Sequence, residues 1–408
     1  MSDTIPATTV SFWQTLNRAV ITLLGVQLLG GMMLAPHSTF FPIYVQERGY
    51  SAIVLANIAA ANQVAGLIAS LVGGALADWL GRKQTLILGS LGFGIASCVF
   101  LVNSAWGIAL LWVAGGFLIG LYVLGSESYL MDVAAPQFLG LTSALFNWGY
   151  TLGGVLSSPL AGLLLERWDY GLLAAVLIAS ALLTSGWISF ILPPSPLAQV
   201  ARPGWRELFG YRPVAGRPLI LLLAGLRFLP TLYYAMLLLL IPLLLNNNGA
   251  SKTVIALYAT ASWSAASLAQ LAVGYAADKW SVNGTTALTF AVSLGSMIVL
   301  ALGSGQLWVI FAAGLVGIAA AWSLSTLLPP LVAQATAPAE RGRTLGFIHL
   351  FWNLAMILGA LLGGQLFSRS ASLPFVAAIT TNVIVWLLLF LFVRAVRHSS
   401  AAGSAGHE

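Results

Sequence analysis

Long uncharged stretches of mostly hydrophobic residues alternate with short polar segments along the whole chain. A helix that crosses a lipid bilayer needs about 20 consecutive apolar residues. Ten stretches without Asp, Glu, Lys or Arg reach that length, at 19–46, 49–77, 84–126, 133–165, 170–201, 228–251, 253–277, 280–339, 344–368 and 370–393. Two of them can hold two helices each, because polar or glycine-rich breaks occur at Asn103-Ser104 and at 303–306. The pattern therefore predicts twelve membrane-spanning helices.

The composition excludes a soluble protein. Of the 408 residues, 59% are hydrophobic and 7% are charged, whereas a soluble domain carries roughly 25% charged residues. The sequence has no phosphate-binding loop, no His-paired nucleophile and no His, Cys, Asp and Glu spacing typical of a metal site. We therefore expect an all-α integral membrane protein that is not an enzyme and that uses no cofactor or metal. Because no basic cluster lies on a soluble domain, the net charge of +6 does not indicate a nucleic-acid partner.

The basic residues predict the orientation of the chain. An even number of spans places both termini on one side, and cytoplasmic loops are enriched in Lys and Arg. If the termini are cytoplasmic, twelve basic residues lie inside: Arg18, Arg82, Lys83, Arg202, Arg206, Arg212, Arg217, Lys279, Arg341, Arg343, Arg394 and Arg397. Four lie outside: Arg48, Arg167, Lys252 and Arg369. We therefore expect both termini in the cytoplasm. Arginine outnumbers lysine 14 to 3, which favours a high-GC bacterial source and hence a bacterial inner membrane.

The two halves of the chain repeat each other at an offset of 200 residues. Between positions 42 and 78, thirteen of 37 positions are identical without a gap, including Pro42 and Pro242, Gly49 and Gly249, and Asp78 and Asp278. A weaker match at offset 202 relates Gly162 to Gly364. Parallel repeats of this kind form transporters whose substrate site lies at the midplane between the halves.

The repeat and the polar segments divide the chain into five parts. We expect a cytoplasmic N-terminus over 1–18, a six-helix bundle over 19–192, a cytoplasmic linker over 193–217, a second six-helix bundle over 218–397 and a disordered cytoplasmic tail over 398–408. The proline-rich linker contains the segment WRELFG at 205–210, which could form a short helix on the membrane surface.

The segment GALADWLGRK at 74–83 resembles the signature that follows the second helix in the major facilitator superfamily. Gly74, Asp78, Gly81, Arg82 and Lys83 match this signature, whereas Trp79 replaces an Arg. The resemblance implies the major facilitator fold, with two pseudo-symmetric bundles of six helices. It also implies a conformational latch, in which Asp78 faces the start of helix 11 and Arg82 pairs with Asp132. The second-half copy keeps Asp278 but lacks the Gly and Arg that follow in the first. The alternative is that the basic residues only set the topology.

Helix 5 carries Gly154, Ser158, Pro159 and Gly162, a pattern similar to that of drug/proton antiporters. Those proteins also have an Arg in helix 4, at the position of Gly116 here. Because small residues equally favour close helix packing, the pattern leaves the mode of coupling open.

Few ionisable residues fall inside the predicted spans, and such residues commonly have functional roles. Arg227 lies near the midplane of helix 7 and could bind a substrate anion, pair with Glu127 or bond to helix carbonyls. Glu127, in helix 4, is the candidate for proton coupling unless a permanent ion pair keeps it charged. His37 and His349 are candidates for the cavity, although packing is the commoner role for such residues.

Polar and aromatic residues concentrate on the helices that line the cavity in the major facilitator superfamily, which this chain resembles. The cavity candidates are Gln27, His37, Asn57, Asn147, Thr151, Arg227, Tyr233, Tyr234, Trp263, Trp322, His349, Trp352 and Asn353. A cavity lined in this way suits a partly apolar organic molecule.

These features lead to one functional hypothesis and two alternatives. The first is a secondary transporter, monomeric in the bilayer, that exports small amphipathic molecules by alternating access and is driven by protons. The second is a symporter or facilitator for a small organic anion held by Arg227. The third is a membrane sensor that binds a ligand without transporting it.

Overall fold

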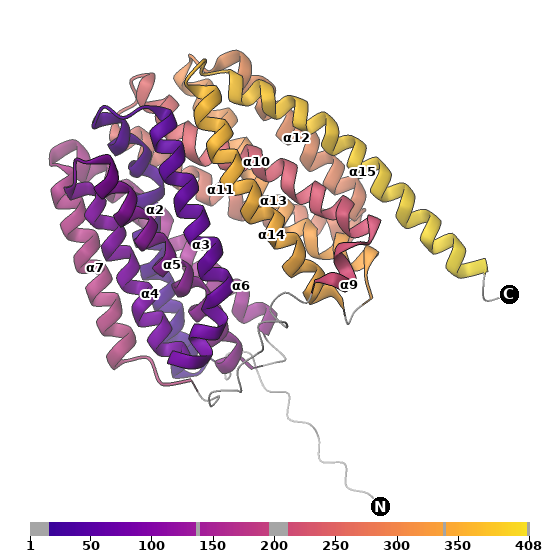
Figure 1. Ribbon diagram of the computed structural model, residues 1–408, viewed down its shortest axis with the longest axis horizontal. Helices are drawn as coiled ribbons and strands as arrows, with labels where there is room; N and C mark the ends of the chain where they lie inside the picture. Colours follow the sequence, from indigo (N-terminus) through magenta and orange to yellow (C-terminus); the bar gives the residue numbers. More distant parts are fainter. Residues whose placement is uncertain (1–15, 136–138, 196–210, 338–339, 406–408) are drawn as a thin grey trace, which may run out of the picture.

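The computed structural model describes residues 16–135, 139–195, 211–337 and 340–405, and its regular structure is helical throughout these ranges. Figure 1 shows two bundles of helices that lie side by side and are related to the two halves of the sequence. The first bundle contains α2 (Arg18–Glu47), α3 (Ala52–Leu80), α4 (Arg82–Ser97) with the turn η1 (Cys98–Leu101), α5 (Ala105–Val133), α6 (Leu139–Arg167) and α7 (Tyr170–Phe190). The second contains α10 (Pro218–Asn247), α11 (Lys252–Lys279), α12 (Val282–Gly303), α13 (Leu307–Ala335), α14 (Arg341–Phe367) and α15 (Leu373–Ala405), preceded by the short α9 (Arg212–Ala215).

The predicted number of spanning helices is confirmed in the described residues. Eleven helices are long and apolar enough to cross a membrane, and α6, with 29 residues, is the twelfth. The two long uncharged stretches divide where expected, between η1 and α5 and between α12 and α13. Helix α10 begins at Pro218, before the uncharged run, so Arg227 lies inside the helix as expected. One boundary differs from the expectation.

Helix α15 continues to Ala405, into the segment where the sequence favours disorder. The alanines of this segment extend a helix that has already formed, so no nucleation cost opposes them. The proposed surface helix at 205–210 lies outside the described residues.

Side-chain caps define where several helices begin. Asn17, Ser104, Asp169, Ser251 and Ser281 each accept a hydrogen bond from a backbone N–H in the first turn of the helix that follows. Such caps satisfy N–H groups that have no partner within the helix. The sequence repeat also recurs in the turns, because Gly49 and Gly249 adopt left-handed φ angles of 82° and 80°. Glycine adopts this conformation without steric cost.

The same helix pairs pack together in both bundles. In the first bundle α2 packs on α6, α4 on α5, α3 on α5 and α4 on α7; in the second, α10 packs on α14, α12 on α13, α11 on α13 and α12 on α15. The closest approaches use glycine. A Cβ atom at Gly31 of α2 would overlap the carbonyl group of Tyr150, and one at Gly359 of α14 would lie 2.6 Å from the carbonyl oxygen of Leu232. The bundles are therefore two copies of one packing scheme.

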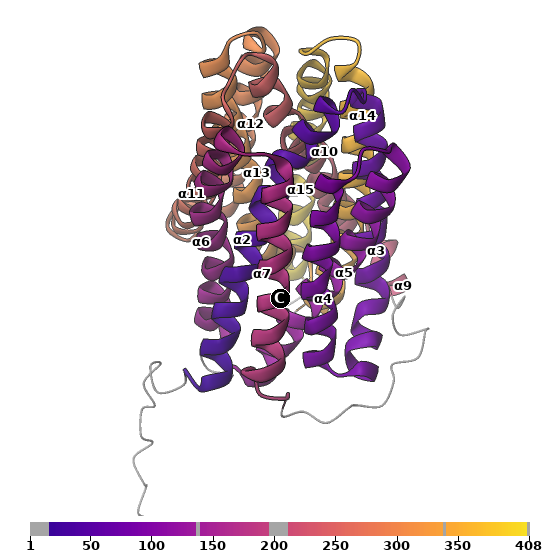
Figure 2. The same ribbon diagram turned by 90° about the vertical axis from the view of Figure 1, so that its left-hand side faces the viewer.

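Large apolar side chains on the outer surface agree with a bilayer around the bundles. Trp106 and Trp308, in the first turns of α5 and α13, are 82% and 70% exposed, and Trp280 at the end of α11 is 72% exposed. Tryptophan is enriched where helices leave the hydrocarbon core. Figure 2 shows the helices of both bundles running along a shared direction, as spanning helices do.

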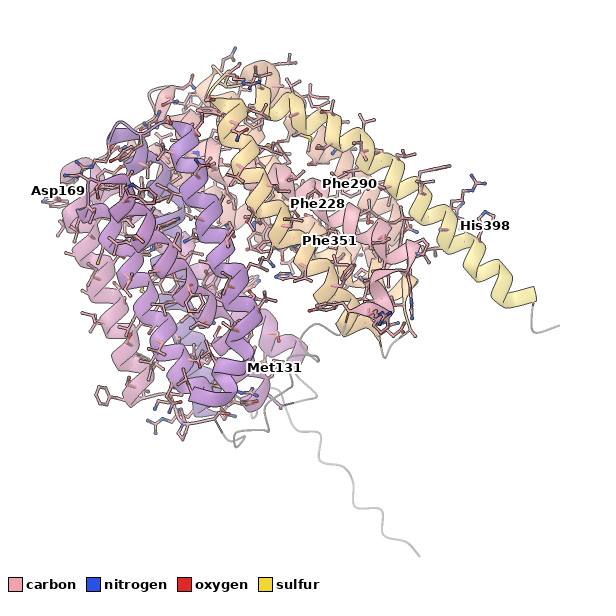
Figure 3. All side chains as sticks on the ribbon, in the orientation of Figure 1. Met131, Asp169, Phe228, Phe290, Phe351 and His398 are labelled. Carbon is pink, nitrogen blue, oxygen red and sulfur yellow. The ribbon has the colours of Figure 1, made fainter. Side chains whose placement is uncertain are left out.

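The two ends of the molecule differ. We call the end where α7 finishes and α10 begins the linker side, and the other end the opposite side. Figure 1 shows the ribbons of the two bundles diverging toward the linker side and meeting at the opposite side. In Figure 3, Met131 marks the linker-side end of the first bundle, and Asp169 lies at its opposite-side end. On the linker side, Arg217 donates to both carboxylate oxygens of Glu340 at 2.6 and 2.7 Å, which raises the pKa of Arg217.

Candidate substrate cavity

A cavity of about 380 Å³ lies between the bundles. Val123 and Glu127 of α5 form its wall in the first bundle, and α10, α13 and α14 form its wall in the second. From the second bundle come Arg227, Pro230, Thr231, Tyr234, Ala321, Trp322, Leu324, Ser325, His349 and Trp352. The structure thus brings three of the four ionisable residues singled out in the sequence, Glu127, Arg227 and His349, to a single cavity.

Glu127 and Arg227 carry opposite charges but do not form an ion pair with each other or with another described residue. Arg227 donates one hydrogen bond, from Nη1 to the hydroxyl of Ser325 at 3.1 Å. A guanidinium has five N–H donors, so most of the donors of Arg227 make no hydrogen bond to a described residue. Glu127 is exposed to the cavity from the facing helix.

Aromatic side chains line the same cavity as these two charged residues. The ring of Tyr234 packs edge-on against Trp322 with centroids 6.2 Å apart, and Trp322 lies 5.7 Å from Trp263. The imidazole of His349 stacks on Trp352 at 5.0 Å. The wall around Arg227 is therefore aromatic, which favours contact with flat apolar groups of a ligand.

Two smaller cavities lie between the bundles, nearer the opposite side. One, of about 60 Å³, shares Tyr234 and Trp322 with the large cavity and also contains Trp263 and Ser38. The other, of about 130 Å³, contains Ser38 together with His37 and Asn62. Shared side chains connect the three spaces along the bundle interface.

His37 and Gly116 are explained by their neighbours in the first bundle. The Nε2 atom of His37 lies 2.9 Å from the hydroxyl of Ser97, and its ring stacks with those of Phe93 and Phe100. At Gly116, where the antiporter pattern has Arg, the amide of Asn62 occupies the space that a Cβ atom would need. That amide donates to the carbonyl of Trp112 at 2.6 Å. The first bundle therefore fills this position with an amide from α3.

Several residues expected in the cavity are not among the side chains that line it. Tyr233 is 1% exposed and pairs with the hydroxyl of Ser296 on α12 at 2.7 Å, so it faces away from the partner bundle. Gln27 is buried beside Gly149 of α6, and Asn353 is buried with its amide donating to the carbonyl of His349. Asn57, Asn147 and Thr151 are absent from the walls of the three cavities. Ser38 and Ser325 do line these cavities, but no sequence pattern distinguishes them from other serines.

Contacts between the bundles concentrate on the opposite side. The Lys252 ammonium pairs with the Glu47 carboxylate, and the Glu166 carboxylate accepts the backbone N–H of Thr253 at 3.1 Å. The amide of Gln46 donates to that of Asn247 at 2.8 Å. Each contact joins a helix of one bundle to a helix of the other. The opposite side is therefore closed by polar contacts.

On the linker side, the loop after α3 makes contacts within the first bundle. Arg82 pairs with Asp132 and donates to the carbonyl of Ser128 at 2.5 Å, while the Lys83 ammonium donates to the carbonyl of Ser189 at 2.8 Å. Gly81 has a φ of 96° and precedes α4 directly. Asp278 is exposed. Gly74 lies in α3. The side chain of Asp78 is outside the part of the structure that is described, so its proposed contact with α14, the eleventh of the predicted helices, stays a prediction.

The family model "Major Facilitator Superfamily" matches residues 23–244 and 223–407. The chain belongs to the major facilitator superfamily. Among solved structures, a mutant of the nucleoside transporter NupG superposes with a TM-score of 0.77 at 14% identity, covering 92% of this chain and 99% of that one.

Two curated transporters match part of the chain. The quinolone resistance protein NorA of Staphylococcus aureus (strain MRSA252) is 31% identical over 118 residues, which cover 28% of this chain and 30% of NorA. The probable galactarate/D-glucarate transporter GudP of Escherichia coli (strain K12) is 30% identical over 133 residues, covering 30% of this chain and 29% of GudP. The matches thus span less than a third of these relatives. Membership of the superfamily and the long apolar helices make this protein a multi-pass membrane protein of a transporter family.

Proposed function

We propose that this protein exports small amphipathic organic molecules from the bacterial cytoplasm in exchange for protons. The observation that carries this proposal is Glu127, a carboxyl group in the cavity between the bundles that forms no ion pair with a described residue. The partial similarity to a drug resistance protein supports the direction of transport.

The linker side is the cytoplasmic side in this proposal. Twelve of the sixteen basic residues outside the spans lie on it in the topology derived above, as the positive-inside rule requires. The structure is then inward-open, since the bundles meet on the opposite side and diverge toward the cytoplasm (Figure 1). A substrate enters from the cytoplasm, and rocking of the bundles exposes it to the outside.

Glu127 couples this movement to protons. When the cavity faces outward, the carboxyl group takes up a proton from the medium, and when the cavity faces inward it releases the proton into the cytoplasm. Outward movement of substrate and inward movement of the proton then use the same cavity in opposite halves of the cycle. A single chain contains both bundles, so the monomer is sufficient for this cycle.

Flux measurements with Glu127→Gln in proteoliposomes test the coupling. The amide keeps the size of the side chain but cannot carry a proton. At a substrate concentration that saturates the variant, we expect it still to exchange substrate across the membrane but to lose accumulation driven by a pH gradient. Asp169→Asn is the matched control, because Asp169 is an exposed cap of α7 and asparagine caps equally well. Accumulation by Glu127→Gln at the wild-type level would place coupling elsewhere.

The second candidate is a symporter or facilitator for an organic anion. Arg227 supports it, because its guanidinium faces the cavity with one hydrogen bond to a described residue, and so does the partial similarity to GudP. The same proteoliposomes separate the two candidates. An inward-directed proton gradient drives substrate out of the vesicle for an antiporter and into it for a symporter, and it has no effect on a facilitator.

A further inference from the structure

Two charges of opposite sign face the cavity from different bundles, Glu127 from α5 and Arg227 from α10, and no described residue neutralises either by an ion pair. A charge in a low-dielectric space is costly unless an opposite charge or hydrogen bonds compensate it. Water can fill this role while the cavity is open to solvent. When the bundles close around a substrate and exclude water, the substrate itself must supply the compensation.

We infer that the substrates are aromatic zwitterions, with an anionic group held by Arg227 and a cationic group held by Glu127. A purely anionic ligand would satisfy Arg227 and leave Glu127 buried without a counter-charge. A purely cationic ligand would have the converse effect. A ligand with both groups compensates both walls at once and adds no net charge to the cavity.

The shape and chemistry of the walls support an aromatic body between the two charged groups. Tyr234, Trp322 and Trp352 line the same space as Arg227, and Ser325 positions the guanidinium. A planar guanidinium binds a carboxylate through two parallel hydrogen bonds. The rings offer flat apolar surface beside it, so the anionic end and the aromatic body of one molecule can be bound together.

The inference rests on the proposed export function and extends it. If the cationic group of the substrate binds the Glu127 carboxylate, a proton on that carboxylate removes the attraction. Substrate and proton then compete for one group, which is what exchange in opposite directions requires.

Equilibrium binding to the purified full-length protein in lipid nanodiscs tests the inference. The probes are three biphenyl compounds: one with a carboxylate at one end and an aminomethyl group at the other, one with the carboxylate alone and one with the aminomethyl group alone. By calorimetry at neutral pH, we expect the zwitterion to bind about tenfold or more tightly than either single-charge compound, which corresponds to roughly 1.4 kcal/mol.

Variants of the two charged residues assign each end of the probe. Arg227→Gln should weaken binding of the zwitterion and of the carboxylate compound about tenfold and leave binding of the amine compound unchanged. Glu127→Gln should weaken binding of the zwitterion and of the amine compound and leave binding of the carboxylate compound unchanged. Arg227→Lys and Glu127→Asp should restore part of the loss, because the charge is retained. Arg369→Gln, an exposed residue outside the cavity, is the control and should bind all three compounds as the wild type does.

Equal affinity for the zwitterion and either single-charge compound would overturn the inference, and so would absence of binding by all three. If both variants weaken binding of all three compounds equally, Arg227 and Glu127 are structural charges that do not bind the substrate directly. Because binding is measured without a gradient, a failure here is separate from a failure of proton-coupled export, which the flux measurements on Glu127→Gln report.

Discussion

The ion pair of Arg82 and Asp132 links three parts of the first bundle. The guanidinium of Arg82 pairs with Asp132 near the end of α5 and donates to the carbonyl of Ser128. The second carboxylate oxygen of Asp132 accepts the hydroxyl of Ser195, which follows α7, at 2.5 Å. The Asp132 side chain is 2% exposed, and loss of one partner from a buried ion pair costs on the order of 3–5 kcal/mol.

Reversal of this ion pair is the first prediction. Arg82→Asp alone places two carboxylates together, and Asp132→Arg alone places two guanidinium groups together, so each should reduce transport and lower the melting temperature. The double variant should recover part of both. Arg82 begins α4 and Asp132 lies in the last turn of α5, where the reversed charges also suit the helix dipoles. A double variant no better than the single variants would show that the pair does not act as proposed.

Neighbouring residues show the limit of prediction from sequence at this scale. Tyr234 lines the cavity, whereas Tyr233 is buried against α12. In a soluble helix, polar positions mark the solvent face. In α10 the side that faces its own bundle and the side that faces the partner bundle are both apolar, so periodicity does not show which tyrosine faces the partner bundle. Arg82 and Asp132 were easier to identify because the motif around Arg82 is local and charged.

At the scale of helices, the sequence repeat produces two equivalent contacts between the bundles. Gly162 of α6 faces α11, where an added Cβ would lie 2.5 Å from Ala256 Cβ and 2.9 Å from the carbonyl oxygen of Lys252. Gly364 of α14 faces α3 at Ala56 in the same way. The glycines are 202 residues apart and the alanines 200 apart. Both contacts therefore need a residue without a side chain.

We predict that Gly162→Ala shifts the protein toward the outward-open state. Overpacking of this kind costs about 1–3 kcal/mol, and a cost of 1.4 kcal/mol changes a population tenfold. In a Cys98→Ser background, Ser38→Cys reports opening, since Ser38 lines the cavities nearer the opposite side. Its labelling by an impermeant maleimide from outside should rise about tenfold.

Gly186→Ala is the matched control for this experiment. A Cβ atom at Gly186 of α7 would meet no heavy atom within 4 Å, so labelling of Ser38→Cys should stay at the level of the parent protein. If Gly162→Ala labels no faster than Gly186→Ala, the α6 and α11 contact does not hold the opposite side closed.

The uncharged runs predict the number of spanning helices because a bilayer imposes a minimum length on each one. They predict helix ends less well. Arg227 interrupts a run without ending α10, since one long polar side chain is tolerated where it faces a cavity between the bundles. The residues beyond Arg397 are mostly polar or small, which favours disorder, yet α15 extends through them to Ala405. Helix ends depend on local competition between helix, solvent and tertiary contacts, which composition does not determine.

At the scale of the whole molecule, the sequence predicts two bundles but not which side is open. The repeat makes the halves alike, so inward-open and outward-open arrangements use the same helices and similar packing. Their energies differ through a few contacts between positions about 200 residues apart, such as Gln46 with Asn247 and Glu47 with Lys252. Such pairs are visible only after the halves are placed against each other.

These contacts must separate for the cavity to open to the outside, and a cross-link across them provides the last prediction. In the Cys98→Ser background, Gln46→Cys and Asn247→Cys replace two side chains that are 2.8 Å apart on α2 and α10. A short bifunctional thiol reagent with a reducible spacer should stop transport, and a reductant should restore it. Gln46→Cys alone, treated identically, should transport normally. Binding from the linker side should survive the cross-link, because the cavity that contains Arg227 and Glu127 is already open in this state. Transport at the uncross-linked rate would show that the opposite side need not open, and alternating access through this interface would then be wrong.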